Sequence, residues 1–435
     1  MSGSTVRRLG LLVLALAACG RSTPRAVVVP TPVPSGVDTM PTAPTRDTTP
    51  VPYVVPPAVD SARKTPPRAA ERPVNRCTFD LENTPESRGL AVKDPISQKY
   101  TSYVGGGVIG RCVGQSLRIF ADSAESYEQN RLYYLIGKVK YREDRVSLDA
   151  DRLTYYQAEE RLVAEGNVVV VMKDSSRMTG PRAEYFRAVR GVRTASRVLM
   201  TARPTLHMYE TDSVGKRQPD PVQLVADNII GEGDTLFTAF GRVELDRTDL
   251  TARGDSATLD NLKQYSRLMK APRVESKGKD AFSLTGRVID VFGRTRKVER
   301  VLSVDSARAV SKDLTLSADT VDLRVTDNRL DRAFAFGPSR ANAVTKERRI
   351  TADSLDVHMP GQRLRELFAV RGAYAESDVD TLKITSTERD WLRGDTIVAR
   401  FDSIPGQDTT SQPTLRDLVA RGQASSFYQM PSNRG

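Results

Sequence analysis

Short runs in which apolar and polar residues alternate fill most of the chain after residue 76, and they predict β-strands. In the clearest run, Leu148 and Ala150 alternate with two aspartates, as the two-residue period of a strand requires. A polar break at residues 157–160 separates this run from the next one. That run ends in Val168 to Met172, a β-branched apolar segment too short for a helix and predicted to be buried on both faces. Because no long amphipathic helix pattern occurs, the sequence predicts an all-β fold.

The two runs form a unit that recurs along the chain at roughly 30-residue spacing, within the range of solenoid-like arrays. One half of the unit contains the dipeptide Ala-Asp, and the other half contains a glycine within an apolar strand. The Ala-Asp halves end at Asp122, Asp151, Asp227, Asp319 and Asp353, and the Gly halves contain Gly137, Gly166, Gly241 and Gly372. We interpret the aspartates as acids at strand ends that satisfy backbone N–H groups of turns. A calcium ladder is the less favoured alternative, because calcium loops gather several oxygen ligands in one short turn.

This ordered series resembles the OstA-like domain of LptA and of the N-terminal part of LptD. These are periplasmic lipopolysaccharide-transport proteins of Gram-negative bacteria. The motifs that carry the resemblance are Leu148-x-Ala-Asp-x-Leu-x-Tyr155 and Leu162-x-Ala-x-Gly-Asn-Val168. The resemblance is clearest over residues 117–185 and continues more weakly to about residue 400. It implies an elongated β-jelly-roll stack of antiparallel strands, which holds acyl chains in an apolar interior and joins LptC-like and LptD-like proteins by edge-strand addition.

The residues that face such an interior depend on the strand register, since a slip of one residue reverses every face. Our candidates for lipid contact are apolar residues of the best-matched block, namely Leu135, Leu148, Leu153, Val168 and Val170. We expect replacement of Val170 by Asp to weaken the binding of acyl lipid.

The N-terminus predicts export and lipid attachment. Residues 1–18 read as a lipoprotein signal peptide, with an apolar segment far shorter than the ~20 residues of a membrane-spanning helix. Leu16-Ala-Ala-Cys19 fits a lipobox, so Cys19 is the predicted lipidation site; an ordinary secretory signal is the alternative. Residues 19–76 are rich in proline and threonine and predict a disordered tether or, equally, low-complexity filler. These features favour the periplasm, at the outer membrane, as the location.

The folded part divides at a proline- and glycine-containing loop, which predicts one jelly-roll block over residues 77–210 and a more divergent one over 222–430. Cys77 and Cys112 are the two cysteines that follow Cys19. In an oxidising compartment such a pair predicts a disulfide, with two free thiols as the alternative.

Charge and motifs argue against other classes of function. The net charge is +11, but residues 1–76 hold 10 basic and 4 acidic residues, so the folded part is nearly balanced, with 55 basic and 50 acidic residues. We therefore expect no nucleic-acid binding, which favours a concentrated basic stripe. The glycines of residues 103–110 match a dinucleotide motif only formally, since the β-like continuation lacks the helix that such a site needs. The two histidines, His207 and His358, lie in different repeats, so we expect no metal, no cofactor and no catalytic site.

Together these features predict a lipid-anchored protein that binds lipopolysaccharide or a similar glycolipid in an apolar groove and helps move it to the outer membrane. Bridge, translocon accessory and free lipid chaperone stay open as roles. The alternatives are a β-repeat spacer whose interior is filled by side chains, and a lipid-modifying enzyme, which would need a catalytic cluster that the sequence does not display.

Overall fold

The computed structural model describes residues 74–209, 220–278, 281–294, 297–327, 329–379, 384, 386, 388–402 and 413–430. These residues form 26 β-strands and one short 3₁₀ turn, which confirms the all-β prediction. The strands of the first half are β1 (Phe79–Asn83), β2 (Arg88–Lys93), β3 (Tyr100–Cys112), β4 (Arg118–Tyr127), β5 (Leu132–Arg142), β6 (Val146–Tyr156), β7 (Arg161–Met172), β8 (Arg177–Phe186), β9 (Arg197–Thr201), β10 (Thr205–Met208), β11 (Val222–Val225), β12 (Asn228–Glu232) and β13 (Leu236–Asp246). The second half comprises β14 (Leu250–Asp260), β15 (Tyr265–Met269), β16 (Arg273–Ser276), β17 (Ser283–Thr285), β18 (Val288–Arg294), β19 (Lys297–Val310), β20 (Thr315–Thr326), β21 (Arg329–Val344), β22 (Arg348–His358), η1 (Pro360–Gln362), β23 (Glu366–Ser377), β24 (Asp390–Asp402), β25 (Thr414–Arg421) and β26 (Ser425–Phe427).

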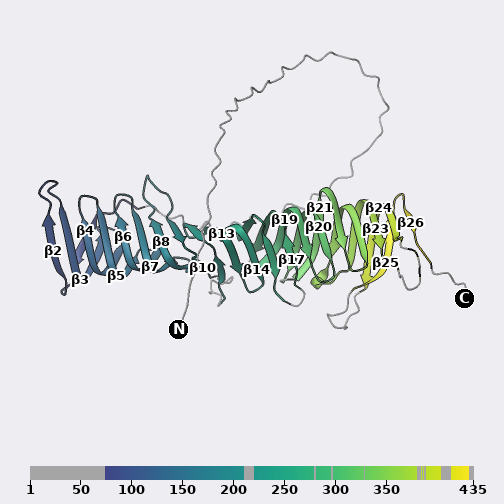
Figure 1. Cartoon of the computed structure of the whole chain (residues 1–435), viewed down its shortest axis with the longest axis horizontal. Helices are drawn as coiled ribbons and strands as arrows, with labels where there is room; N and C mark the ends of the chain where they lie inside the picture. Colours follow the sequence, from purple (N-terminus) through teal and green to yellow (C-terminus); the bar gives the residue numbers. More distant parts are fainter. Residues whose placement is uncertain are drawn as a thin grey trace, which may run out of the picture. The chain divides into compact units, whose positions relative to one another are not determined.

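Neighbouring strands pair antiparallel in chain order, so the sheet is a stack of rungs (Figure 1). Some rungs consist of two collinear strands, for example β1 with β2 on β3 and β25 with β26 on β24. With neighbouring strands about 4.8 Å apart, about 20 rungs give a stack on the order of 90 Å long. The sheet passes through the predicted joint without a break, because β9 pairs with β12 and β10 pairs with β11.

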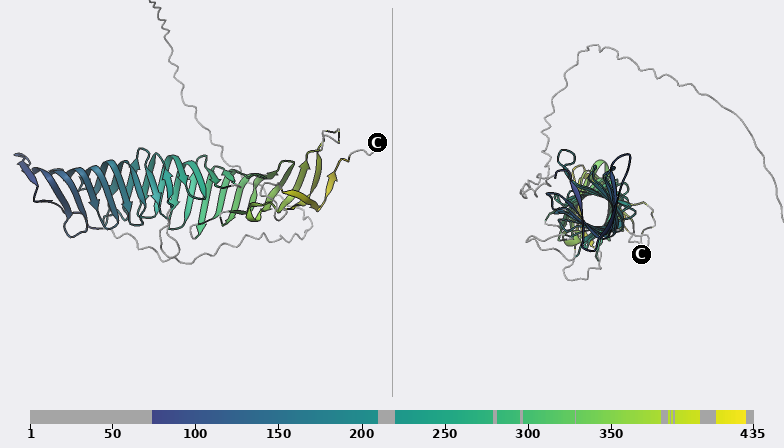
Figure 2. Two further views of the ribbon diagram at one scale, coloured as in Figure 1. Left: turned by 90° about the horizontal axis from the view of Figure 1, so that it is seen from below. Right: turned by 90° about the vertical axis from the view of Figure 1, so that its left-hand side faces the viewer.

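The register shifts in the middle of most rungs, so each rung has two arms and the stack has two walls. The view along the length of the stack shows the strands arranged around its long axis (Figure 2). The shift coincides with a β-bulge, which we call the corner of the rung, in which two successive residues have positive φ, for example Gly166 at 76° and Asn167 at 46°. Asp151 of the neighbouring strand covers this glycine so closely that an added Cβ would lie 2.3 Å from its Oδ2 atom. The same close approach pairs Gly137 with Asp122, Gly241 with Asp227, Gly337 with Asp319 and Gly422 with Asp395.

The interpretation of the repeated aspartates as strand ends is therefore wrong for four of the five, whereas Asp227 does lie between the ends of β11 and β12. Asp151 lies inside β6 and accepts a hydrogen bond from the Asn167 side chain at 2.9 Å, and Asp319 lies inside β20 and accepts from the backbone N–H of Ser339. The sequence could not distinguish a mid-strand corner from a strand end, because both need polar groups and positive-φ residues.

The turns between rungs lie along two edges of the stack, which we call the first rim and the second rim. The first rim contains turns 113–117, 143–145, 173–176, 247–249, 311–314 and 345–347, and the second contains turns 128–131, 157–160, 233–235, 261–264 and 359–365.

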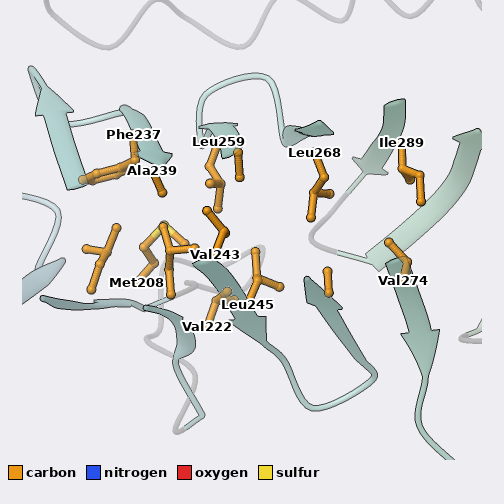
Figure 3. Packing of buried hydrophobic residues seen from close by; sticks show 14 of the residues in the cluster. Met208, Val222, Phe237, Ala239, Val243, Leu245, Leu259, Leu268, Val274 and Ile289 are labelled. Carbon is orange, nitrogen blue, oxygen red and sulfur yellow. The ribbon is translucent and has the colours of Figure 1, made fainter. Parts of the chain in front are cut away.

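Apolar side chains from both walls fill the space between them (Figure 3). Strand β13 shows how one rung supplies both walls: Phe237 and Ala239 precede its corner and face Val243 and Leu245, which follow it. In the apolar segment at the end of β7, only one face of the strand is buried. Val168, Val170 and Met172 are at most 3% exposed, whereas the residues between them are half-buried, so the predicted burial of this segment on both faces is wrong.

Candidate functional site

The five predicted lipid-contact residues all point into the interior of the stack. Leu135, Leu148, Leu153, Val168 and Val170 are at most 1% exposed. Leu135 lies opposite Leu153 in the register of β5 and β6, and Leu148 lies opposite Val170 in that of β6 and β7. They pack against one another and against other apolar side chains, so an acyl chain could reach them only if the two walls moved apart.

Aromatic rings fill the interior near the N-terminal end of the stack. Phe79 of β1 packs edge-on against Tyr133 and Tyr155, with ring centroids 4.5 and 5.2 Å apart. A disulfide joins Cys77 to Cys112 at the end of β3, with Cα atoms 5.3 Å apart. These are the two cysteines for which the sequence predicts a disulfide, and the bond holds β1 on the first rungs.

A buried ion-pair network joins the two rims in the same region. Arg187, which is 1% exposed, donates to Glu143 of the first rim and to Glu160 of the second rim, each at 2.8 Å. The hydroxyl groups of Tyr141 and Tyr155 donate to the same carboxylates at 2.7 and 2.8 Å. Burial and the neighbouring carboxylate both raise the pKa of Tyr155, so it stays a neutral donor. The network therefore links the two rims through one arginine whose charge is paired with a carboxylate on each side.

The interior opens into a cavity toward the C-terminal end of the stack. Its volume is about 280 Å³, near the lower end of the range for ligand pockets in proteins. Both walls supply apolar side chains, because Ile350 and Leu392 precede the corners of their strands whereas Leu367 and Leu418 lie in the other wall. We call this space the C-terminal cavity. Its apolar lining is Ala343, Ile350, Leu367, Ala375, Trp391, Leu392, Ala399, Phe401, Leu415, Leu418 and Phe427.

An aromatic row lies on the outer face of the strands beside the C-terminal cavity, because Trp391 alternates along β24 with Asp390 and Leu392 of the inner face. Trp391 stacks between Tyr374 and Phe427, with ring centroids 6.4 Å from each. It is the single tryptophan of the chain, so its fluorescence reports on the strands that border this cavity.

Polar side chains stand along the first-rim side of the cavity. They include Arg348 at the start of β22 and Ser377 at the end of β23, which are register neighbours, together with Glu376, Asp390 and Ser426. Apolar walls with a polar border suit a molecule that has an acyl chain and a polar head. None of these residues was among the candidates from the sequence, because the repeat becomes weaker toward the C-terminus. The sequence did contain a signal for the apolar lining of this cavity, because Leu392 occupies the same position in its repeat as Leu148, one of our candidates for lipid contact.

The part of the chain that the structure describes shows no group of side chains suited to a metal ion. No three His, Cys, Asp or Glu side chains there are grouped to hold a metal ion. The described residues also contain no helix long and apolar enough to cross a membrane. The predicted lipidation site Cys19, the signal peptide and all but the last three residues of the tether lie outside the described residues.

Comparison with known protein families matches residues 118–297 to the family described as LptA/(LptD N-terminal domain) LPS transport protein. No individual curated protein matches the chain. The matched residues cover the Ala-Asp and Gly corners from β4 to the start of β19, which are the features that carried the resemblance in the sequence.

Proposed function

Because its residues 118–297 place the chain in the LptA/(LptD N-terminal domain) family of LPS transport proteins, we propose that it binds lipopolysaccharide or a similar glycolipid in its apolar interior and helps move it to the outer membrane. The C-terminal cavity is the observation that carries this proposal. Each methylene group moved from water into it contributes about 0.8 kcal/mol. The sugar and phosphate parts of the lipid stay outside, at the polar border.

The ends of the stack support end-to-end contacts with similar jelly-roll proteins. In the described part of the chain, β1 and β2 pair with β3 alone, and β25 and β26 pair with β24 alone. Such strands keep unpaired backbone groups, which accept a further strand. Strand β2 also carries Leu90 and Val92, which are 64% and 50% exposed. We assign LptC-like or LptD-like proteins as partners on this basis.

The N-terminal sequence supports attachment at the outer membrane through lipidated Cys19, with residues 19–76 as the tether. Family membership supports the cell envelope of a Gram-negative bacterium as the location. Mass spectrometry of globomycin-treated and untreated cells tests the anchor, since an unprocessed precursor is expected with the drug, and unchanged processing would contradict it.

A spacer without lipid transport is the second candidate, and the filled interior around Leu148 and Val170 favours it. Two measurements separate the candidates. Native mass spectrometry of gently extracted protein should detect bound glycolipid, and an acyl lipid brominated near its chain end should quench the fluorescence of Trp391. If neither bound lipid nor quenching is found, the spacer becomes the better description.

A further inference from the structure

Comparison of the repeats with one another singles out one position on the inner face of the first rim. It lies five residues before the corner, and the corner residues are Asp122, Asp151, Pro181, Asp227, Asp255, Arg287, Asp319, Asp353 and Asp395. In the first seven repeats the residue at this position is small or apolar and less than 9% exposed. These residues are Leu117, Val146, Ser176, Val222, Leu250, Phe282 and Leu314. They close the interior against the first rim.

The eighth repeat breaks this rule. Its residue is Arg348, which is partly exposed and lines the C-terminal cavity. The side chain points inward, because Arg348 shares the inner face of β22 with buried Ile350 and Ala352. A closing apolar residue has therefore been replaced by a cation at the rung where the interior opens.

The Arg348 guanidinium has no carboxylate partner within the described part of the chain. Its neighbour Arg349 faces Glu376 at 3.9 Å, and Arg389 donates to the same carboxylate at 2.6 Å. Glu376 is thus already paired with two other arginines. A cation beside an apolar cavity gains most from an anion that brings its own apolar chain, because the chain displaces water around the ion pair.

The ninth repeat has Asp390 at the same position, and this carboxylate also lines the cavity. It accepts a hydrogen bond from the backbone N–H of Gln429 at 2.9 Å. The negative charge of Asp390 repels an anion at the border of the cavity, and the positive charge of Arg348 offsets this repulsion. The hydroxyl group of Ser377 adds a donor on the strand next to Arg348, and Ser426 adds one farther along the cavity, on β26. A phosphate offers more acceptor oxygens to such a set than a carboxylate does.

We propose that Arg348 binds the phosphate of an acyl lipid whose chain occupies the C-terminal cavity. This inference rests on the proposed function, because it requires the cavity to accept an acyl chain. It goes further by assigning a head-group residue and a preference for phosphorylated lipid, and by placing the lipid at the C-terminal end of the stack.

The test uses the purified mature chain and three probes with the same chain length: dodecyl phosphate, laurate and dodecyl maltoside. Binding is followed below the critical micelle concentration by Trp391 fluorescence and by calorimetry. Arg348→Leu restores the residue type of the other repeats, so it should fold normally. It should weaken dodecyl phosphate binding about tenfold or more, which corresponds to the loss of one charge-assisted hydrogen bond. Binding of dodecyl maltoside should change less than twofold.

Lys346→Leu is the matched control, since it removes the same charge two residues earlier, in the turn before β22, at an exposed residue that does not line the cavity. It should leave dodecyl phosphate binding unchanged, and Asp390→Asn should strengthen it. Equal effects of the Arg348 and Lys346 variants, or a preference for laurate, would overturn the proposal while acyl binding stands. Failure of all three probes to bind would instead overturn the proposed function. Dimerisation that masks Trp391 would show that a second copy of the chain occupies the cavity.

Discussion

Substitution of the corner glycine Gly166 by alanine tests the physical reason for the repeat. At its φ of 76°, an alanine costs about 1–2 kcal/mol in backbone conformation. The new Cβ would also overlap with Oδ2 of Asp151. The Asp151 side chain must therefore shift and lose the hydrogen bond that it accepts from the Asn167 side chain. Crowding of this kind costs about 1–3 kcal/mol more. We therefore expect Gly166→Ala to lower the free energy of unfolding by about 2–5 kcal/mol in total.

The chain contains a matched control for the backbone part. Gly191 also has a φ of 76°, but no atom lies within 4 Å of the position of its added Cβ. Gly191→Ala should cost only the conformational ~1–2 kcal/mol. The double variant Asp151→Ala, Gly166→Ala should be more stable than the sum of the two single changes implies. Urea unfolding with unchanged m-values compares these four variants, Asp151→Ala included, with the unchanged protein. Equal losses at Gly166 and Gly191, or additive effects in the double variant, would refute the Asp–Gly corner as the cause.

Four further outcomes follow from the structure. Replacing both Cys77 and Cys112 by alanine opens a loop with a sequence separation of 35 and should cost about 4 kcal/mol by chain entropy; unchanged urea unfolding would contradict this. Arg187→Met leaves the buried carboxylate of Glu160 and the partly buried one of Glu143 without their cation and should cost about 3–5 kcal/mol, whereas a neutral result would mean that water replaces the guanidinium. Burial alone would raise the pKa of Asp290, but hydrogen bonds from Arg267 and Tyr265 outweigh this effect and lower the pKa below 3.8. The stability that ionised Asp290 contributes is therefore present above pH 3.8 and is lost as the pH falls through the lowered pKa. Asp290→Asn should therefore flatten the fall of the melting temperature below pH 4, and an unaltered profile would reject that assignment. Val170→Asp, which we expect to weaken acyl-lipid binding, should also lower the free energy of unfolding, because it buries a carboxylate without a partner. A variant that unfolds at an unchanged urea concentration would place Val170 outside the core.

The amino-acid sequence alone indicated the strand class, the repeat and the resemblance to the family that residues 118–297 match. Period-two alternation is a local property, and the Ala-Asp and Gly halves are each short enough to recognise without contacts. The cysteine pair followed from the number of cysteines and the predicted export, and alternation defines that Leu148 and Ala150 share one face of their strand.

Only the tertiary structure decided what those faces enclose. The contact between Asp151 and Gly166 depends on the register of two strands and on a bulge that shifts it, and a one-residue difference would separate them. Whether the interior is filled or open depends on the summed volumes of side chains that face one another across the two walls. The same alternating pattern therefore encloses a filled core at Val170 and an open cavity beside Arg348.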